Sequence, residues 1–169
     1  TMVNAGTLQA GKSNVFSNAS SIALANVAGV GLNLNGYDQT IGSLRGGGAS
    51  GGNVSLGTAT LTTGADNTST TYAGVISGSG GLVKTGAGMM LLAGNQSFTG
   101  QTRVDEGNLV VNGNLPGQLQ VQNSGKLSGN GSVGSVTNRG TVSPGVNGAG
   151  QLHVSSYSGD GTLEIYVGE

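Results

Sequence analysis

A short unit that joins a turn to a strand recurs along this chain and restricts its fold more than any other feature. The unit reads Asn/Asp-x-Gly-x-Leu/Val at residues 4–8, 105–109, 123–127 and 138–142, with a looser copy at 159–163. In the second half, glycines in this setting stand at positions 88, 107, 125, 140 and 161, so the intervals are 19, 18, 15 and 21 residues. Two or three short strands and their turns fill such an interval. Each repeat then corresponds to one coil of a β-helix that advances by one strand spacing, about 4.8 Å.

Between the turns, apolar and polar residues alternate in short runs. The clearest runs are 21–24, 31–34, 53–56, 59–62, 118–121, 151–154 and 162–167. Alternation places the Leu, Val and Ile of each run on one face of a strand. Helix is disfavoured because every window of 11 residues contains Gly, Ser or Thr. We therefore predict an all-β parallel β-helix with inward apolar ladders. A β-sandwich is the alternative, but it does not require the repeated unit.

Glycine accounts for 35 of the 169 residues, about three times its usual share of about 7%. Repeated corners explain this excess, because glycine tolerates positive φ. We expect Gly107, Gly125 and Gly140 to occupy equivalent corners with positive φ, and Leu109 and Leu127 to stack in neighbouring coils. The glycine-rich stretch 46–52 is expected to be flexible, since ordering its backbone costs entropy.

Several classes of protein are disfavoured by composition. Charged residues make up 8% and the net charge is −1, so the cationic surface that binds nucleic acid is missing. The chain has no cysteine, which excludes disulfides and thiolate chemistry. Its longest strictly apolar stretch, residues 89–93, is too short for a membrane helix, and residues 1–6 do not resemble a signal peptide. The end at Glu169, directly after a strand pattern, suggests a fragment of a longer protein.

Candidate chemical motifs are weak. The run 78–85 ends in Lys-Thr but lacks the Gly before Lys and the helix after it that a phosphate loop needs. His153 is the one histidine, expected to face outward, and residues 130–134 lack the first Gly of a nucleophile elbow. Asp105 and Glu106 are adjacent and would point to opposite faces.

Basic residues and turn motifs are equally weak as signs of a site. Lys84, Arg103, Lys126 and Arg139 recur about once per coil, which could form an outward basic line, although a solubilising role is favoured. Residues 159–161 suggest a calcium repeat, but the tandem spacing is missing. We therefore expect no catalytic, cofactor-binding or metal site, no cofactor, and no nucleic-acid or small-molecule substrate.

Residues 78–113 closely resemble the passenger-associated transport repeat of bacterial autotransporters. The resemblance rests on Gly-Ser-Gly-Gly-Leu-Val-Lys-Thr-Gly-Ala-Gly at 78–88, Gly94 to Gly100, and Val104 to Leu109. Residues 127–145 are similar to the next segment of such passengers, and 35–44 to a coil that precedes the repeat. Departures are Gln96 in place of Asn, Asp105-Glu106 in place of small polar residues, and apolar Met89 and Leu91 on the outer face.

The resemblance implies a right-handed β-helix, one continuous solenoid with stem coils at 1–77 and a transport repeat and autochaperone-like region at 78–169. It implies a non-enzymatic passenger stem of type V secretion. Such a stem is exported through the outer membrane by a C-terminal translocator β-barrel of the same polypeptide, and displays an adhesin or effector at the bacterial surface. The alternative is an adhesive module whose outer face contacts host receptors, glycans or sister passengers. A β-helical glycan-cleaving enzyme is a third possibility, against which the missing acid cluster speaks.

Overall fold

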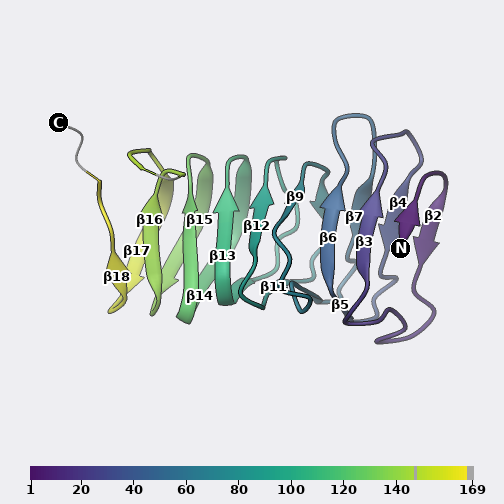
Figure 1. Ribbon diagram of the computed structural model, residues 1–169, viewed down its shortest axis with the longest axis horizontal. Coiled ribbons are helices and arrows are strands. Elements are labelled where there is room, and N and C mark those ends of the chain that lie inside the picture. The colour runs from purple at the N-terminus through teal and green to yellow at the C-terminus, as the bar shows by residue number, and fades with distance from the viewer. Residues whose placement is uncertain (147, 167–169) are drawn as a thin grey trace.

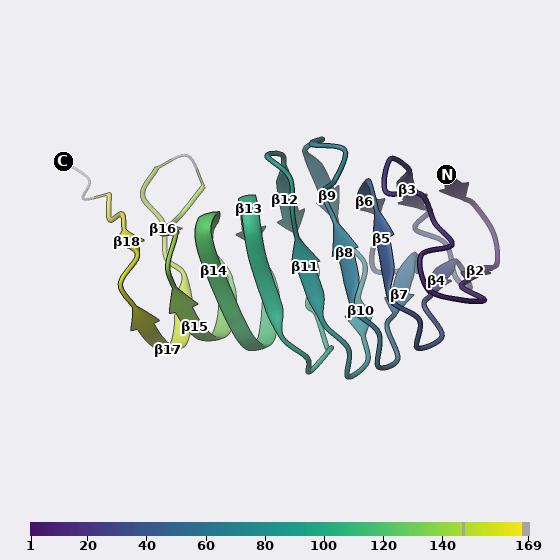
Figure 2. The same ribbon diagram turned by 90° about the horizontal axis from the view of Figure 1, so that it is seen from below.

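The computed structural model describes residues 1–146 and 148–166 and forms an elongated parallel β-helix of about eight coils. The strands stack along the rod from the N-terminal end to the C-terminal end, and the helix is right-handed, as parallel crossovers nearly always are (Figures 1 and 2). In the described part of the chain, no helix is long and apolar enough to span a membrane. Three strand positions recur in each coil, and we call the resulting surfaces faces 1, 2 and 3.

Face 1 runs the length of the rod. It contains β1 (Met2–Val3), β3 (Ser21–Leu24), β6 (Ser43–Gly46), β9 (Thr70–Tyr72), β12 (Met89–Leu92), the ends of β13 (Thr102–Val111) and β14 (Asn114–Gly129), β16 (Thr141–Pro144) and β18 (Thr162–Leu163).

Face 2 is also continuous. It contains β5 (Gln39–Ile41), β8 (Leu61–Thr63), β11 (Leu82–Lys84), the start of β13, the middle of β14, and the ends of β15 (Ser132–Asn138) and β17 (His153–Gly159).

Face 3 starts with β2 (Thr7–Gln9), β4 (Gly31–Asn33), β7 (Asn53–Ser55) and β10 (Ile76–Ser77). It continues through the first residues of β14, β15 and β17, which pair in parallel. Residues 96–98 join the two parts, because the Ser97 amide donates to Ile76 O and the Gln96 amide donates to Asn114 O. All three faces therefore enclose one interior.

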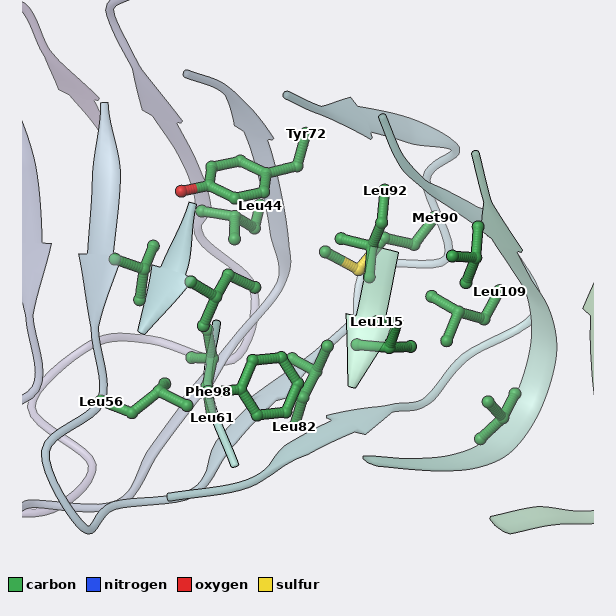
Figure 3. Packing of buried hydrophobic residues seen from close by; sticks show 14 of the residues in the cluster. Leu44, Leu56, Leu61, Tyr72, Leu82, Met90, Leu92, Phe98, Leu109 and Leu115 are labelled. Carbon is green, nitrogen blue, oxygen red and sulfur yellow. The ribbon is translucent and has the colours of Figure 1, made fainter. Parts of the chain in front are cut away.

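The interior is a set of apolar ladders, as the alternation predicted. Leu109 lies in register with Leu127, and both side chains are fully buried, which confirms their predicted stacking. Met90 precedes them in the same row and Val142 follows. Figure 3 shows Met90, Leu92 and Leu109 directed into this interior, with the aromatic ring of Tyr72 in the neighbouring coil. Burial of these rows supplies the main driving force for the fold.

The coils are shortest between Val104 and Asn138. On face 2, successive partners are separated by 22, 21, 20, 17, 17 and 21 residues, in the order Ile41, Thr63, Lys84, Val104, Val121, Asn138 and Gly159. Short connections leave little irregular chain between faces, so β13 and β14 each continue round a corner and reach 10 and 16 residues. Most of the expected runs are strands, but those at 59–62 and 151–154 begin two residues late, at Leu61 and His153. The expected run at 162–167 is a strand to Leu163, and Val167 lies outside the described residues.

The glycine-rich stretch 46–52 forms a defined turn in the structure. Gly48 and Gly51 form an antiparallel bridge, and the Gly47 amide donates to Leu24 O at 2.8 Å. A Cβ atom at Gly47 or Gly52 would lie 2.6 Å from backbone atoms across the turn. The glycines allow a tight corner between faces 1 and 3 that packs against the preceding coil.

Candidate functional site

Residues 78–113 form the central coils of the rod, where every strand has a neighbour on both sides. On face 2, β11 pairs with β8 on one side and with β13 on the other. On face 1, β12 pairs with β9 and with the end of β13. Because its strands pair on both sides, such a coil fixes the alignment of the coil before it and of the coil after it. We therefore treat these coils as the candidate functional site.

Lys84 contributes a buried charge to this site. Its register places it between Thr63 and Val104 in an inward row, and its side chain is 1% exposed. The ammonium Nζ donates to Thr85 O and Gly86 O at 2.7 Å and to Glu106 O in the next coil at 3.2 Å. Burial lowers the pKa of Lys84, and the nearby Glu106 carboxylate partly offsets this. The three donors of an ammonium are thus matched by three carbonyl oxygens.

The outward basic line considered from the sequence is therefore not formed. Lys84 points inward, and Arg103 lies on the outer side of face 2, where its guanidinium pairs with Asp105 at 2.6 and 2.8 Å. Lys126 lies on face 1 and pairs with Glu164 at 2.9 Å. The basic residues recur about once per coil along the sequence. They occupy different faces and different sides of the strands, so they do not line up on the surface. Each ion pair is half-exposed and contributes little to stability.

Gln96 and Asn95 form hydrogen bonds that connect three successive coils at the corner between faces 1 and 3. Gln96 is 3% exposed; its Oε1 accepts the Ile76 amide at 2.8 Å, and its Nε2 donates to Gly94 O at 2.7 Å and Gly74 O at 3.3 Å. Asn95 Oδ1 accepts the Asn114 amide of the following coil at 2.9 Å. The longer side chain of Gln96, noted as a departure from the repeat, thus reaches backward across the coil boundary.

The same type of contact recurs along this corner. An asparagine Oδ1 accepts an amide of the next coil at Asn26–Ser50, Asn53–Val75, Asn112–Asn130 and Asn130–Gln151. Corner amides have no strand partner, so a short side-chain acceptor from the preceding coil satisfies them. The asparagines therefore hold successive coils in register outside the strands.

The repeated glycines occupy one corner, between faces 2 and 1, as their spacing predicted. Gly107 is in register with Gly125, and the pairs Lys126–Thr141 and Thr141–Thr162 place Gly140 and Gly161 next in the row. The predicted positive φ is right for Gly107, at 70°, and wrong for Gly125 and Gly140. At those two positions a Cβ atom would collide with carbonyl oxygens of the preceding coil, Val104 O and Gln122 O respectively. Close approach of backbones therefore requires glycine there.

Met89 and Leu91 lie on the outer side of face 1, as the resemblance implied. Their strand neighbours Met90 and Leu92 are buried, whereas Met89 and Leu91 are half-buried. Val110, in register with Leu91, also faces outward but is only 1% exposed. A groove of about 340 Å³ above these residues is lined by Met89, Val110, Lys126, Val146 and Tyr166, among others.

The other motifs singled out in the sequence do not assemble into a reactive site. His153 is exposed at the start of β17. Gly78 and Gly80 in the lysine-containing run pack against the backbone of Gly57 and Ala59, so they serve coil contact. Asp105 is engaged by Arg103. Among residues 1–146 and 148–166, no three His, Asp or Glu side chains gather where they could hold a metal ion.

Comparison with known proteins agrees with this geometry. The family model of the passenger-associated transport repeat matches residues 82–111, which include β11, β12 and β13 in full. An adhesin autotransporter, BmaC of Brucella suis biovar 1 (strain 1330), is 48% identical over 109 residues, covering 63% of this chain. The chain therefore resembles a segment of an autotransporter passenger, and we call it the passenger segment below.

Two further relatives share the passenger segment. An extracellular serine protease of Serratia marcescens is 48% identical over 81 residues, or 47% of this chain. The Neisserial autotransporter lipoprotein NalP of Neisseria meningitidis serogroup B (strain ATCC BAA-335 / MC58) is 41% identical over 69 residues, or 40% of this chain. The matches cover only 3%, 8% and 6% of the three relatives, respectively. No solved structure matches the passenger segment.

The autotransporter relatives are exported through the outer membrane, to the cell surface or the extracellular medium. The protease relatives match only in a repeat region, so the match carries no catalytic assignment. Sequence reasoning missed the buried position of Lys84. Alternation could have located it, because Lys84 stands two residues after the inward Leu82 in the same short strand.

Proposed function

We propose that this passenger segment is a stem whose coils from about residue 78 onward act as an autochaperone, that is, as a folding template for the coils before them. The stem would assist translocation through a C-terminal β-barrel of the same polypeptide and would hold an adhesin or effector away from the outer membrane. The proposal rests mainly on the coil-to-coil contact of Lys84, whose ammonium group is completed by a carbonyl oxygen of the following coil.

Physical templating explains why such contacts matter. A folded coil exposes a row of unpaired backbone donors and acceptors and a layer of apolar side chains. The next coil can therefore fold against it without the free-energy cost of a new nucleation step. The Lys84 ammonium completes its three hydrogen bonds only when Glu106 O, on the C-terminal side, is in place. Burying Lys84 before that coil forms would leave part of the charge unpaired. Growth from the C-terminal side toward the N-terminal side is thereby favoured.

Limited proteolysis and export test this role. After partial digestion of the 169-residue chain, residues from about 78 onward should survive the loss of the N-terminal part, and they should refold without it. In the complete autotransporter, deletion of residues 78–166 should reduce surface delivery of the passenger. Simultaneous digestion of both halves, or normal export of the deletion variant, would contradict the autochaperone role.

A second candidate function is adhesion through the outer face. Leu91 and Met89 are apolar side chains on the outer surface of the transport repeat, and the Brucella relative carries the name adhesin. Replacement of both residues by serine should then reduce cell aggregation or binding to host-cell surfaces while export continues. Unchanged adhesion in the double variant would leave the outer apolar residues without this role.

We also infer that the segment has no catalytic activity of its own. Support comes from the exposed, isolated setting of His153 and from the pairing of Asp105 with Arg103. Incubation of the purified chain with polysaccharides and with peptide substrates should release neither reducing ends nor peptides. Turnover that disappears in His153→Ala would refute the inference.

A further inference from the structure

Face 1 opens locally between β6 and β9. On one side, β6 pairs with β3 over four residues, and β9 pairs with β12 over three. Between them, the pairing is reduced to Gly46 and Tyr72. The connection from β8 to β9 takes six residues, 64–69, whereas Gly42 alone connects β5 to β6. The longer connection shifts β9 away from β6 and leaves a groove on the outer surface of the rod.

We call this the Arg45 groove. It has a volume of about 550 Å³ and is lined by Ser21, Arg45, Gly46, Asp66 and residues 68–71. Ser21 and Thr71 lie on the outer side of their strands and offer hydroxyl groups that can both donate and accept hydrogen bonds. The Thr68 hydroxyl already donates to Asp66, and the Ser69 hydroxyl accepts the Met89 amide.

Asp66 is largely used by its own loop. Its Oδ2 accepts the Ser43 hydroxyl at 2.7 Å, and its Oδ1 accepts the Thr68 amide at 3.0 Å and the Thr68 hydroxyl at 2.7 Å. Burial alone would raise the pKa of Asp66, but these hydrogen bonds outweigh it and hold the pKa below its usual value. The carboxylate therefore stays charged near neutral pH and fixes the loop that forms the groove wall.

Arg45 supplies a free cation to the groove. It points outward between Ala23 and the neighbouring strand, is exposed, and has no ion pair within 4.0 Å among the residues that the structure describes. The other charge in the groove, on Asp66, already receives three donors. The guanidinium of an arginine matches the planar, bidentate geometry of a carboxylate.

We propose that the Arg45 groove binds a carboxylate-bearing sugar, with the guanidinium on the carboxylate and the Ser and Thr hydroxyls on the ring hydroxyls. The site does not depend on the folding role proposed above. It gives this part of the stem a specific ligand class, acidic glycan, and places recognition in the coils that precede the transport repeat.

Binding of glucuronate to the purified 169-residue chain at pH 7, measured by ligand-observed NMR or calorimetry, tests the proposal. We expect saturable binding that Arg45→Ala weakens at least tenfold and that Arg45→Lys also weakens, because the bidentate fork is lost. Arg139→Ala is the matched control, since Arg139 is another exposed arginine outside this groove, and it should leave binding unchanged. Glucuronamide and glucose should each bind at least tenfold more weakly than glucuronate.

Several results would overturn the site. Equal binding of glucuronate and glucuronamide, or equal loss in the Arg45 and Arg139 variants, would remove the role of the Arg45 guanidinium. Competition by inorganic sulfate at the same concentration as glucuronate would show a general anion site and no sugar site. No binding to the wild-type chain would refute the proposal. Because Arg45 is exposed, its variants should keep the unfolding midpoint, and proteolysis of the same samples reports the folding role separately.

Discussion

At the scale of single residues, buried polar groups show how tightly this interior is specified. Lys84 is satisfied by three carbonyl oxygens, and Tyr72 donates from its hydroxyl to Gly52 O at 2.9 Å. Among the described residues, Thr102 Oγ1 is buried without a hydrogen-bond partner. A buried polar group that is paired stabilises or is neutral, whereas an unpaired one costs free energy.

Lys84→Met should lower the free energy of unfolding by about 1 to 3 kcal/mol, because one buried and two partly buried carbonyl oxygens lose their donor. Urea unfolding of the purified chain measures this loss. Arg103→Met is the control in the next coil: its ion pair with Asp105 is half-exposed, so the loss should stay below about 1 kcal/mol. A Lys84→Met protein as stable as wild type would show that the carbonyl oxygens need no charged donor.

Thr102→Val should raise the free energy of unfolding by about 1 kcal/mol, since it removes the unpaired hydroxyl and keeps the shape of the side chain. The change is visible as a higher urea midpoint. Thr62→Val, on the outer side of the same face, should change stability by less than about 0.5 kcal/mol. Destabilisation by Thr102→Val would mean that the hydroxyl has a partner, such as an internal water.

At the scale of strands and corners, stability comes from rows of equivalent residues in successive coils. Leu109, Leu127 and Val142 form one such row on face 1, and Leu163 is its next member. Gly107, Gly125 and Gly140 form a second row at the corner that precedes these strands. A change in one member affects both neighbouring coils, so its effect depends on the position within the row.

Leu127→Ala should destabilise the chain by about 2 to 5 kcal/mol, because a fully buried side chain between Leu109 and Val142 is removed. Leu163→Ala serves as the control in the same row, since Leu163 is 50% exposed and should lose less than half as much. Thermal or urea unfolding compares the two. Similar losses would contradict the stacking of Leu127 in the interior.

Gly125→Ala should destabilise the chain by about 1 to 3 kcal/mol, because the added Cβ atom meets Val104 O of the preceding coil. Gly11→Ala is matched to it: neither glycine has positive φ, and nothing lies within 4 Å of a Cβ at position 11. That control should leave stability unchanged or slightly higher. The comparison of unfolding midpoints separates close approach from backbone strain, and equal effects would show that packing does not decide the choice of glycine.

At the scale of the whole molecule, the strands of each coil pair only with those of neighbouring coils, so the position along the rod governs local stability (Figure 1). Hydrogen exchange should be slowest in β11, β12 and β13, which are paired on both sides, and faster in β1 and β18, which each pair with one strand. Mass spectrometry of exchanged peptides measures this gradient. Uniform protection from one end to the other would indicate a single cooperative unit in place of a template that neighbouring coils extend.

The sequence alone determined the period of the coils, the side of each strand that faces inward and the row to which each glycine belongs. These properties are local, because alternation and turn residues act within a few positions and the repeated unit copies them along the chain. Leu109, Leu127 and the equivalent corners of Gly107 and Gly125 were predictable for that reason.

The tertiary structure decided which residues meet across coils. The bond from Lys84 to Glu106 O, the bond between Gln96 and Ile76, the need for glycine at Gly125 and the opening beside Arg45 all depend on neighbours about 20 residues away. Those neighbours are set by the length of each connection, such as the six residues that precede β9. Connection length shifts one coil against the next without changing the local pattern, so the contacts between coils emerge only when the coils are stacked.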